Sequence, residues 1–193
     1  MKKIITLVFM SLSLQSCFFA VGAAAGAAAI AMVYDHRKIS NTLQDTSIAN
    51  KIVSNLSAYK KLWEASHISV TVFNHIVLLT GETPKSEWRQ LAGEIAKSVS
   101  GVDKVYNQLS IEGPTSSLTR TSDSWITTKI RSQMLASENL KSSTIKVVTE
   151  NGVVYLMGIV SRAQADLAVD IARKVTGVQR VMKVFIYTAP ARS

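Results

Sequence analysis

The chain has 193 residues, 47% of them hydrophobic, which is enough for one ordinary domain or two small ones with buried cores and excludes wholesale disorder. Its formal net charge of +9 at pH 7 favours anionic partners such as nucleic acid, lipid headgroups or acidic proteins, without choosing among them.

The N-terminus has the order of a secretory signal peptide. Two lysines at positions 2 and 3 precede an apolar run that ends at Ser16-Cys17, so we predict a signal peptide over residues 1–16. The segment Leu14-Gln15-Ser16-Cys17 resembles the bacterial lipobox, in which the Cys is acylated and becomes the new N-terminus, although Gln15 is an unusual choice. Cys17 is the only Cys in the sequence, and a thiol that carries lipid needs no disulfide partner.

The alternative is an uncleaved transmembrane anchor, because Phe18 to Val33 is also apolar and extends the run past about 20 residues. We favour lipidation of Cys17, since several acyl chains hold a protein firmly on a bilayer. The resemblance to the lipobox also implies a destination. Asp directly after the Cys retains a lipoprotein at the inner membrane, and here that residue is Phe18, so we expect an anchor in the outer membrane with the protein on its periplasmic face.

Residues 17–44 are expected to form the lipidated, Ala-rich tether, and its polar end, 35–44, is typical of a linker. After it the sequence repeats itself at an offset of about 77 residues. We predict a first copy over residues 45–111, a linker over 112–122 that contains Gly113-Pro114, and a second copy over 123–189.

Each copy begins with a predicted amphipathic helix. An Asp stands at the expected N-cap, and apolar residues follow at four-residue spacing: Ile48, Ile52 and Leu56 in the first copy, and Ile126, Ile130 and Met134 in the second. A β-hairpin comes next. Asn151-Gly152 is the strongest two-residue hairpin signal, whereas Asn74-His75 forces His75 into a less comfortable positive φ.

A second helix and a last strand complete each copy. The helices carry apolar residues at four-residue spacing and are expected to stop at Gly101 and Gly177, since Gly favours the left-handed conformation after a helix. We therefore predict an α+β fold: two tandem αββαβ domains, each with a three-stranded mixed sheet and two helices on one face. A unit of roughly 65 residues is marginal alone, so we expect the copies to pack on each other.

The order of helix, alternating strand, Asn-Gly hairpin, Leu-x-Gly, Ala-rich helix and Gly-Val strand resembles the BON domain (bacterial OsmY and nodulation). The resemblance covers both copies and is strongest over residues 123–133 and 149–158, while Asn74-His75 departs from the Asn-Gly pattern. With the lipobox in front, it implies a non-enzymatic envelope protein that supports outer-membrane integrity and assembly. It also implies that the first helix of the second domain contacts anionic phospholipid.

Differences between the copies point to the same helix. Residues 45–111 hold 7 basic and 6 acidic side chains, whereas 123–193 hold 10 and 5. At about 100° per residue, Trp125 lies opposite the core stripe, at a position where the first copy has Ser47. An indole beside cations suits a membrane interface. The predicted phospholipid-binding residues are Trp125, Thr128, Lys129, Arg131, Ser132 and Leu135 on the helix, with Leu140 and Lys141 after it.

Three alternatives remain open at this stage. Trp125 could pack against the first domain instead of lipid. The patch could dock on a protein partner such as the outer-membrane assembly machinery, with lipid serving only as tether. Nucleic-acid binding through the basic surface is disfavoured by the export signal. We expect no catalytic residues, small-molecule substrate, cofactor or metal site, because no catalytic motif occurs and the three histidines fall in unrelated segments.

Overall fold

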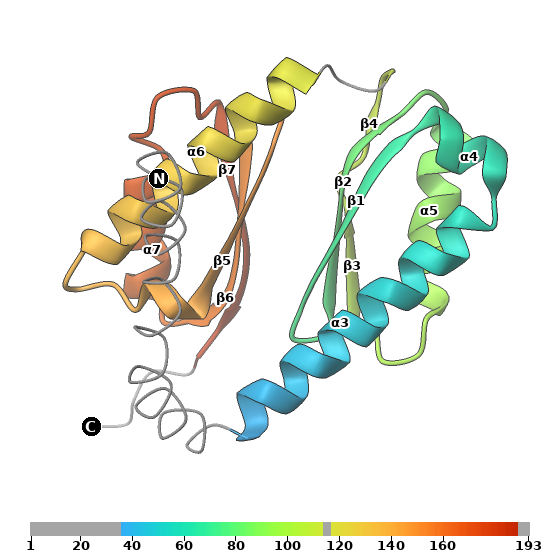
Figure 1. Ribbon diagram of the computed structural model, residues 1–193. Coiled ribbons are helices and arrows are strands. Elements are labelled where there is room, and N and C mark those ends of the chain that lie inside the picture. The colour runs from blue at the N-terminus through green and yellow to red at the C-terminus, as the bar shows by residue number, and fades with distance from the viewer. Residues whose placement is uncertain (1–35, 114–116, 189–193) are drawn as a thin grey trace, which may run out of the picture. The chain divides into compact units, whose positions relative to one another are not determined.

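The computed structural model describes residues 36–113 and 117–188. Residues 44–193 form one compact unit, in which two α+β repeats follow each other along the chain (Figure 1). The predicted signal peptide, Cys17 and the apolar segment after it lie outside the described residues. Within the described ranges, no helix is both long and apolar enough to cross a bilayer.

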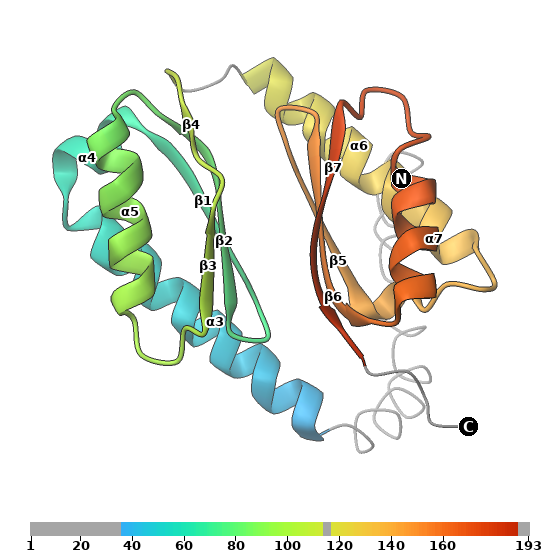
Figure 2. The ribbon, with the colours of Figure 1, turned by 180° about the vertical axis from the view of Figure 1, so that it is seen from behind.

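The first repeat is built around its central strand, which pairs antiparallel with the strand before it and parallel with the strands after its helix. Both long helices pack on the same face of this sheet (Figure 2). The elements are α3 His36–Ser57, α4 Lys60–Ala65, β1 His67–Phe73, β2 Ile76–Thr83, α5 Ser86–Ser98, β3 Lys104–Asn107 and β4 Ser110–Ile111, with β2 in the centre.

The second repeat has the same order and the same mixed sheet, with β6 between β5 and β7. Its elements are α6 Ser117–Ala136, the 3₁₀ turn Ser142–Thr144, β5 Ile145–Glu150, β6 Val153–Val160, α7 Arg162–Ala172 and β7 Arg180–Tyr187. The predicted α+β fold is confirmed. One sheet has four strands instead of three because the last strand of the first repeat is interrupted between Asn107 and Ser110.

The predicted apolar stripes of the first helices form the cores. Ile48, Ile52 and Leu56 of α3 are buried with the helix-facing side chains of the first sheet. Ile126, Ile130 and Met134 of α6 occupy the equivalent places in the second core. Four-residue spacing brings these side chains to one side of a helix, and their burial against the sheet contributes to each repeat's hydrophobic stabilisation.

Both hairpin turns have two central residues, each with positive φ: Asn74 (46°) and His75 (65°) in the first repeat, and Asn151 (49°) and Gly152 (72°) in the second. This is the backbone of a type I′ turn, which matches the twist of the flanking strands. The prediction for His75 is therefore confirmed. Its imidazole Nδ1 lies 2.7 Å from the carbonyl oxygen of Gly101, an interaction that favours the strained residue.

The two repeated aspartates are not N-caps, contrary to expectation. α3 begins at His36 and α6 begins at Ser117, so Asp45 and Asp123 lie inside their helices. The Asp123 carboxylate accepts hydrogen bonds from the backbone N–H groups of Asn151 (2.7 Å) and Gly152 (2.9 Å). Asp45 accepts the same pair of bonds from the first turn, at 2.6 and 2.9 Å.

The structure differs from the sequence expectations in where two kinds of helix begin and end. The segments expected as linkers, 35–44 and 112–122, are helical from His36 and from Ser117 respectively. The sequence did not predict these extensions, because the four-residue apolar stripe of each core is interrupted at Gln44 and at Ser122. Gly101 and Gly177 do have φ near 90°, but the helices end earlier, at Ser98 and Ala172. The glycines lie in the turns that follow.

The repeats also contact each other through the sheet faces opposite the helices. Leu78 of β2 is buried in one apolar cluster with Tyr155, Met157 and Val184 of the second repeat. Lys146 Nζ donates to the carbonyl oxygen of Val72 (3.2 Å), and Asn151 Nδ2 donates to Glu82 Oε1 (2.6 Å). The expected packing of the two copies on each other is confirmed.

Candidate functional site

The outward face of α6 carries two large apolar side chains in water. Trp125 is 54% exposed and Leu135 is 77% exposed, whereas Ile126, Ile130 and Met134 on the opposite side of the helix are at most 2% exposed. Folding normally buries such side chains, and an exposed aromatic residue on an ordered helix is typical of a binding surface.

Hydroxyl groups fill the helix surface between Trp125 and Leu135. The side chains of Ser124, Thr128 and Ser132 each donate to the backbone carbonyl oxygen four residues earlier, at 2.9–3.0 Å. These hydroxyls are therefore turned onto the helix backbone instead of reaching outward. The helix surface between Trp125 and Leu135 is therefore polar, and these two apolar side chains project from it.

Cationic side chains lie beside this face in two different ways. Lys129 is exposed on α6, and Lys141 is exposed in the loop that follows it. Arg131 is exposed too, but its Nη2 donates to the carbonyl oxygen of Val147 (3.0 Å), which holds the guanidinium on the flank of α6 next to β5. Five predicted residues thus share one exposed face, and Arg131 borders it: Trp125, Thr128, Lys129, Ser132 and Leu135.

Leu140 does not belong to this surface, and its inclusion is corrected. The side chain is only 6% exposed and packs in the core of the second repeat. The turn that follows α6 folds back on the domain: the Leu140 N–H donates to the carbonyl oxygen of Ser137 (3.1 Å), and the Lys141 N–H donates to Gln164 Oε1 (2.8 Å). A Leu in a short loop therefore completes the core instead of extending the exposed face.

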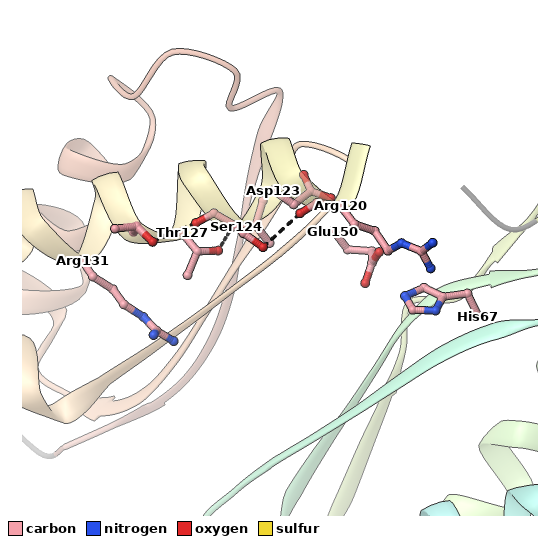
Figure 3. A pocket seen from close by; sticks show the side chains of 9 residues that line it. His67, Arg120, Asp123, Ser124, Thr127, Arg131 and Glu150 are labelled. Carbon is pink, nitrogen blue, oxygen red and sulfur yellow. Dashed lines mark hydrogen bonds between the residues drawn. The ribbon is translucent and has the colours of Figure 1, made fainter. Parts of the chain in front are cut away.

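A groove of about 380 Å³ runs along the flank of α6 (Figure 3). Of the residues that line it, Thr128 and Arg131 are among the predicted phospholipid-binding residues, and the others are not. Arg120 lies in a segment expected as linker, and His67 comes from the other repeat, so spacing along one helix could not find them. The lining residues are His67, Arg120, Asp123, Ser124, Thr127, Thr128, Arg131, Thr149 and Glu150.

Electrostatics in the groove are dominated by Glu150. Burial, and to a smaller extent the nearby carboxylate of Glu82, raise the pKa of its carboxyl group to about 7. Glu82 is itself fully buried. Lys146 at the contact between the repeats has its pKa lowered by burial. The Glu150 carboxyl group is therefore protonated in a large fraction of molecules near neutral pH.

The other two tryptophans of the chain lie in the first repeat. Trp63 and Trp88 pack against the first core, and the Lys85 ammonium lies 4.7 Å from the centre of the Trp88 ring. In the part of the chain that the structure describes, no group of three or more His, Cys, Asp or Glu side chains could hold a metal ion.

Comparison with known families decides what the repeated unit is. The BON domain model matches residues 44–113 and again residues 122–189. The chain belongs to the BON domain family. The two repeats are two BON domains, and α6 is the first helix of the second one.

Three relatives match this chain over most of its length. The chain is 34% identical to the outer membrane lipoprotein DolP of Haemophilus influenzae, over 97% of this chain and 96% of that protein. It is 37% identical to a 21 kDa hemolysin of Actinobacillus pleuropneumoniae, over 79% of both chains. It is 31% identical to the osmotically-inducible protein Y of Escherichia coli, over 75% of this chain and 73% of that one. These relatives support a dual BON-domain protein of the DolP type from the cell envelope.

Comparison of the two BON domains distinguishes features that the fold requires from a feature that occurs in one domain only. The turn-binding aspartates, core stripes and turn glycines occur in both domains. The exposed indole does not, since the residue equivalent to Trp125 in α3 is Ser47. The second BON domain therefore carries the surface that needs a functional explanation.

Proposed function

We propose that this protein is a non-enzymatic lipoprotein, anchored through Cys17 on the periplasmic face of the outer membrane, whose second BON domain binds anionic phospholipid through α6. In this role it supports outer-membrane integrity. The single observation that carries the lipid-binding proposal is the exposed Trp125 on an ordered helix beside Lys129.

The chemistry of this face suits a bilayer surface. An indole has its lowest free energy at headgroup depth, where its ring meets apolar chains and its N–H meets water. Leu135 adds apolar area at the other end of the face. Each basic side chain near an anionic surface contributes about 1 kcal/mol, so α6 alone binds weakly. A lipid tether on the same chain raises the local concentration and makes weak binding sufficient.

Binding to anionic vesicles tests the proposal, with a variant that replaces the exposed indole by a carboxylate. In the chain from residue 18 onward, which carries neither the signal peptide nor the thiol for acylation, we expect Trp125→Glu to weaken binding to phosphatidylglycerol vesicles about tenfold or more. Loss of the inserted indole and repulsion of the new carboxylate act together. Vesicle co-sedimentation measures the affinity, and circular dichroism checks the fold.

A matched control is available in the other domain. Ser47→Glu adds the same charge at the equivalent position of α3, which is also exposed, and we expect it to leave vesicle binding within about twofold. Equal binding by wild type and Trp125→Glu would exclude α6 as the lipid site.

The second candidate function is a scaffold that docks on a protein, such as the outer-membrane assembly machinery, with lipid serving only as tether. The same exposed Trp125 is what favours it, because indoles are also enriched at protein interfaces. A photocrosslinker at position 125 separates the two functions. Lipid adducts support membrane binding, whereas protein adducts alone support the scaffold.

A further inference from the structure

The groove beside α6 holds cationic and hydroxyl groups that lie outside the proposed membrane-binding face, which consists of Trp125, Thr128, Lys129, Ser132 and Leu135. Arg120 of α6, His67 of β1 and Glu150 of β5 point toward one another at one end of it (Figure 3). Within the described residues, neither the Arg120 guanidinium nor the His67 ring takes part in a hydrogen bond or ion pair. Two donors thus face one space, and the Glu150 carboxyl group faces it with them.

The acidic side chains nearby are engaged elsewhere. Asp123 receives two backbone N–H groups of the Asn151-Gly152 turn, and Glu82 of β2 receives the Asn151 side-chain amide. Their acceptor oxygens are therefore committed to holding the turn and the contact between the domains.

A hydroxyl group adds a further donor. Thr149 Oγ1 accepts a hydrogen bond from Thr127 Oγ1 at 2.7 Å, so its own proton points away from Thr127 and is available to a ligand. Guanidinium, imidazole and hydroxyl groups all donate, and an arginine fork matches the oxygens of a phosphate group in particular.

The groove is continuous with the membrane-binding face, because Thr128 and Arg131 border both. We infer that the groove binds the phosphate group of an anionic lipid headgroup, with Arg120 and His67 as its donors. This inference rests on the proposed function. It adds a headgroup site on the flank of α6 to the apolar contact made by Trp125.

Protonation of Glu150 sets when the site is available. When ionised, its carboxylate competes with the ligand for Arg120 and repels the phosphate; when neutral, it does neither. The groups that face it are Glu82 and Thr80 of β2, Asp123 and Arg120 of α6, and His67 of β1. The pKa near 7 therefore predicts tighter phosphate binding at pH 6 than at pH 8. A phosphodiester keeps one negative charge over this range, so the ligand contributes no titration of its own.

The test uses glycerophosphoglycerol, the soluble phosphodiester headgroup of phosphatidylglycerol, with the chain from residue 18 onward. We expect NMR shift changes at Arg120 and His67 that saturate at pH 6, with affinity about three- to tenfold lower at pH 8. Arg120→Gln and His67→Ala should each weaken binding at pH 6 about tenfold, the loss of one charge-assisted or strong donor. Arg173→Gln, which removes a charge from an exposed pair with Asp170, should not change it.

The possible results separate this inference from the proposed function. Binding of the headgroup that is unchanged in both Arg120→Gln and His67→Ala overturns the headgroup site, even if Trp125→Glu abolishes vesicle binding. Headgroup binding that depends on Arg120, together with vesicle binding that ignores Trp125, supports the site and contradicts α6 as the membrane-inserting face. Binding of inorganic phosphate without glycerophosphoglycerol also overturns the lipid assignment. In the His67→Ala background, which removes the imidazole from the site, Glu150→Gln should abolish the remaining difference in headgroup affinity between pH 6 and pH 8, and a persistent difference there would contradict the role of Glu150.

Discussion

A single carboxylate holds each hairpin turn at its helix. In a type I′ turn the first N–H groups point outward and find no partner in the strands, and here an aspartate one element away receives both. The same arrangement occurs twice in the chain, at Asp45 and at Asp123. These hydrogen bonds explain why an aspartate occurs at the same position in both repeats. An N-cap role, inferred from its place before the apolar stripe, does not explain it.

Removing the buried member of this pair should be costly. Asp123 is only 6% exposed, so Asp123→Ala leaves two backbone N–H groups without an acceptor, and we expect a loss of about 2–3 kcal/mol in the free energy of unfolding. Urea denaturation measures it. Asp170→Ala, which breaks an exposed ion pair with Arg173, should cost less than about 1 kcal/mol. Similar losses in the two variants would mean that Asp123 contributes little to the turn.

At the level of helices and strands, the four-residue spacing of apolar side chains predicted which helix faces are buried. The core faces of α3 and α6 and the exposure of Trp125 all follow from four-residue periodicity. The start of α6 could not be predicted, because the four-residue apolar stripe is interrupted at Ser122 and Leu118 is the one apolar residue in 117–122. Leu140 could not be placed either, since a loop residue enters the core through tertiary folding and not through a local pattern.

The central strand of each BON domain contains a glycine for a steric reason. Gly158 of β6 pairs with Ile145, and a Cβ there would lie 2.6 Å from the Thr144 carbonyl oxygen. Because that neighbour is backbone, Gly158→Ala must displace β5, and we expect it to lower the free energy of unfolding by about 2 kcal/mol or more. Gly113→Ala is the control, since no atom lies within 4 Å of its added Cβ. Hydrogen exchange of the β5 amides should rise only in the first variant, and unchanged exchange in both would refute the steric explanation.

At the scale of the whole molecule, the two BON domains are coupled by a contact that mixes apolar and ionisable groups. Leu78 packs with Tyr155 and Met157, while Glu82 and Glu150 bring two carboxyl groups together at its edge. Such a pairing belongs to no single repeat, so the sequence of either copy gives no sign of it. The carboxyl pair should make the stability of the folded chain depend on pH.

The direction of that dependence follows from the pKa of Glu150. Folding raises it from 4.5 to about 7, so between these values the folded state binds more protons than the unfolded state and its stability falls as pH rises. We expect a loss of about 1–2 kcal/mol between pH 4.5 and 7.5, less than the full shift would give, because the group is partly exposed and screened by water. Glu150→Gln should remove this component from denaturation curves recorded across the range. Glu138→Gln removes a carboxylate from the exposed surface and controls for net charge, and the same slope in wild type and Glu150→Gln would show that the pair does not control the contact.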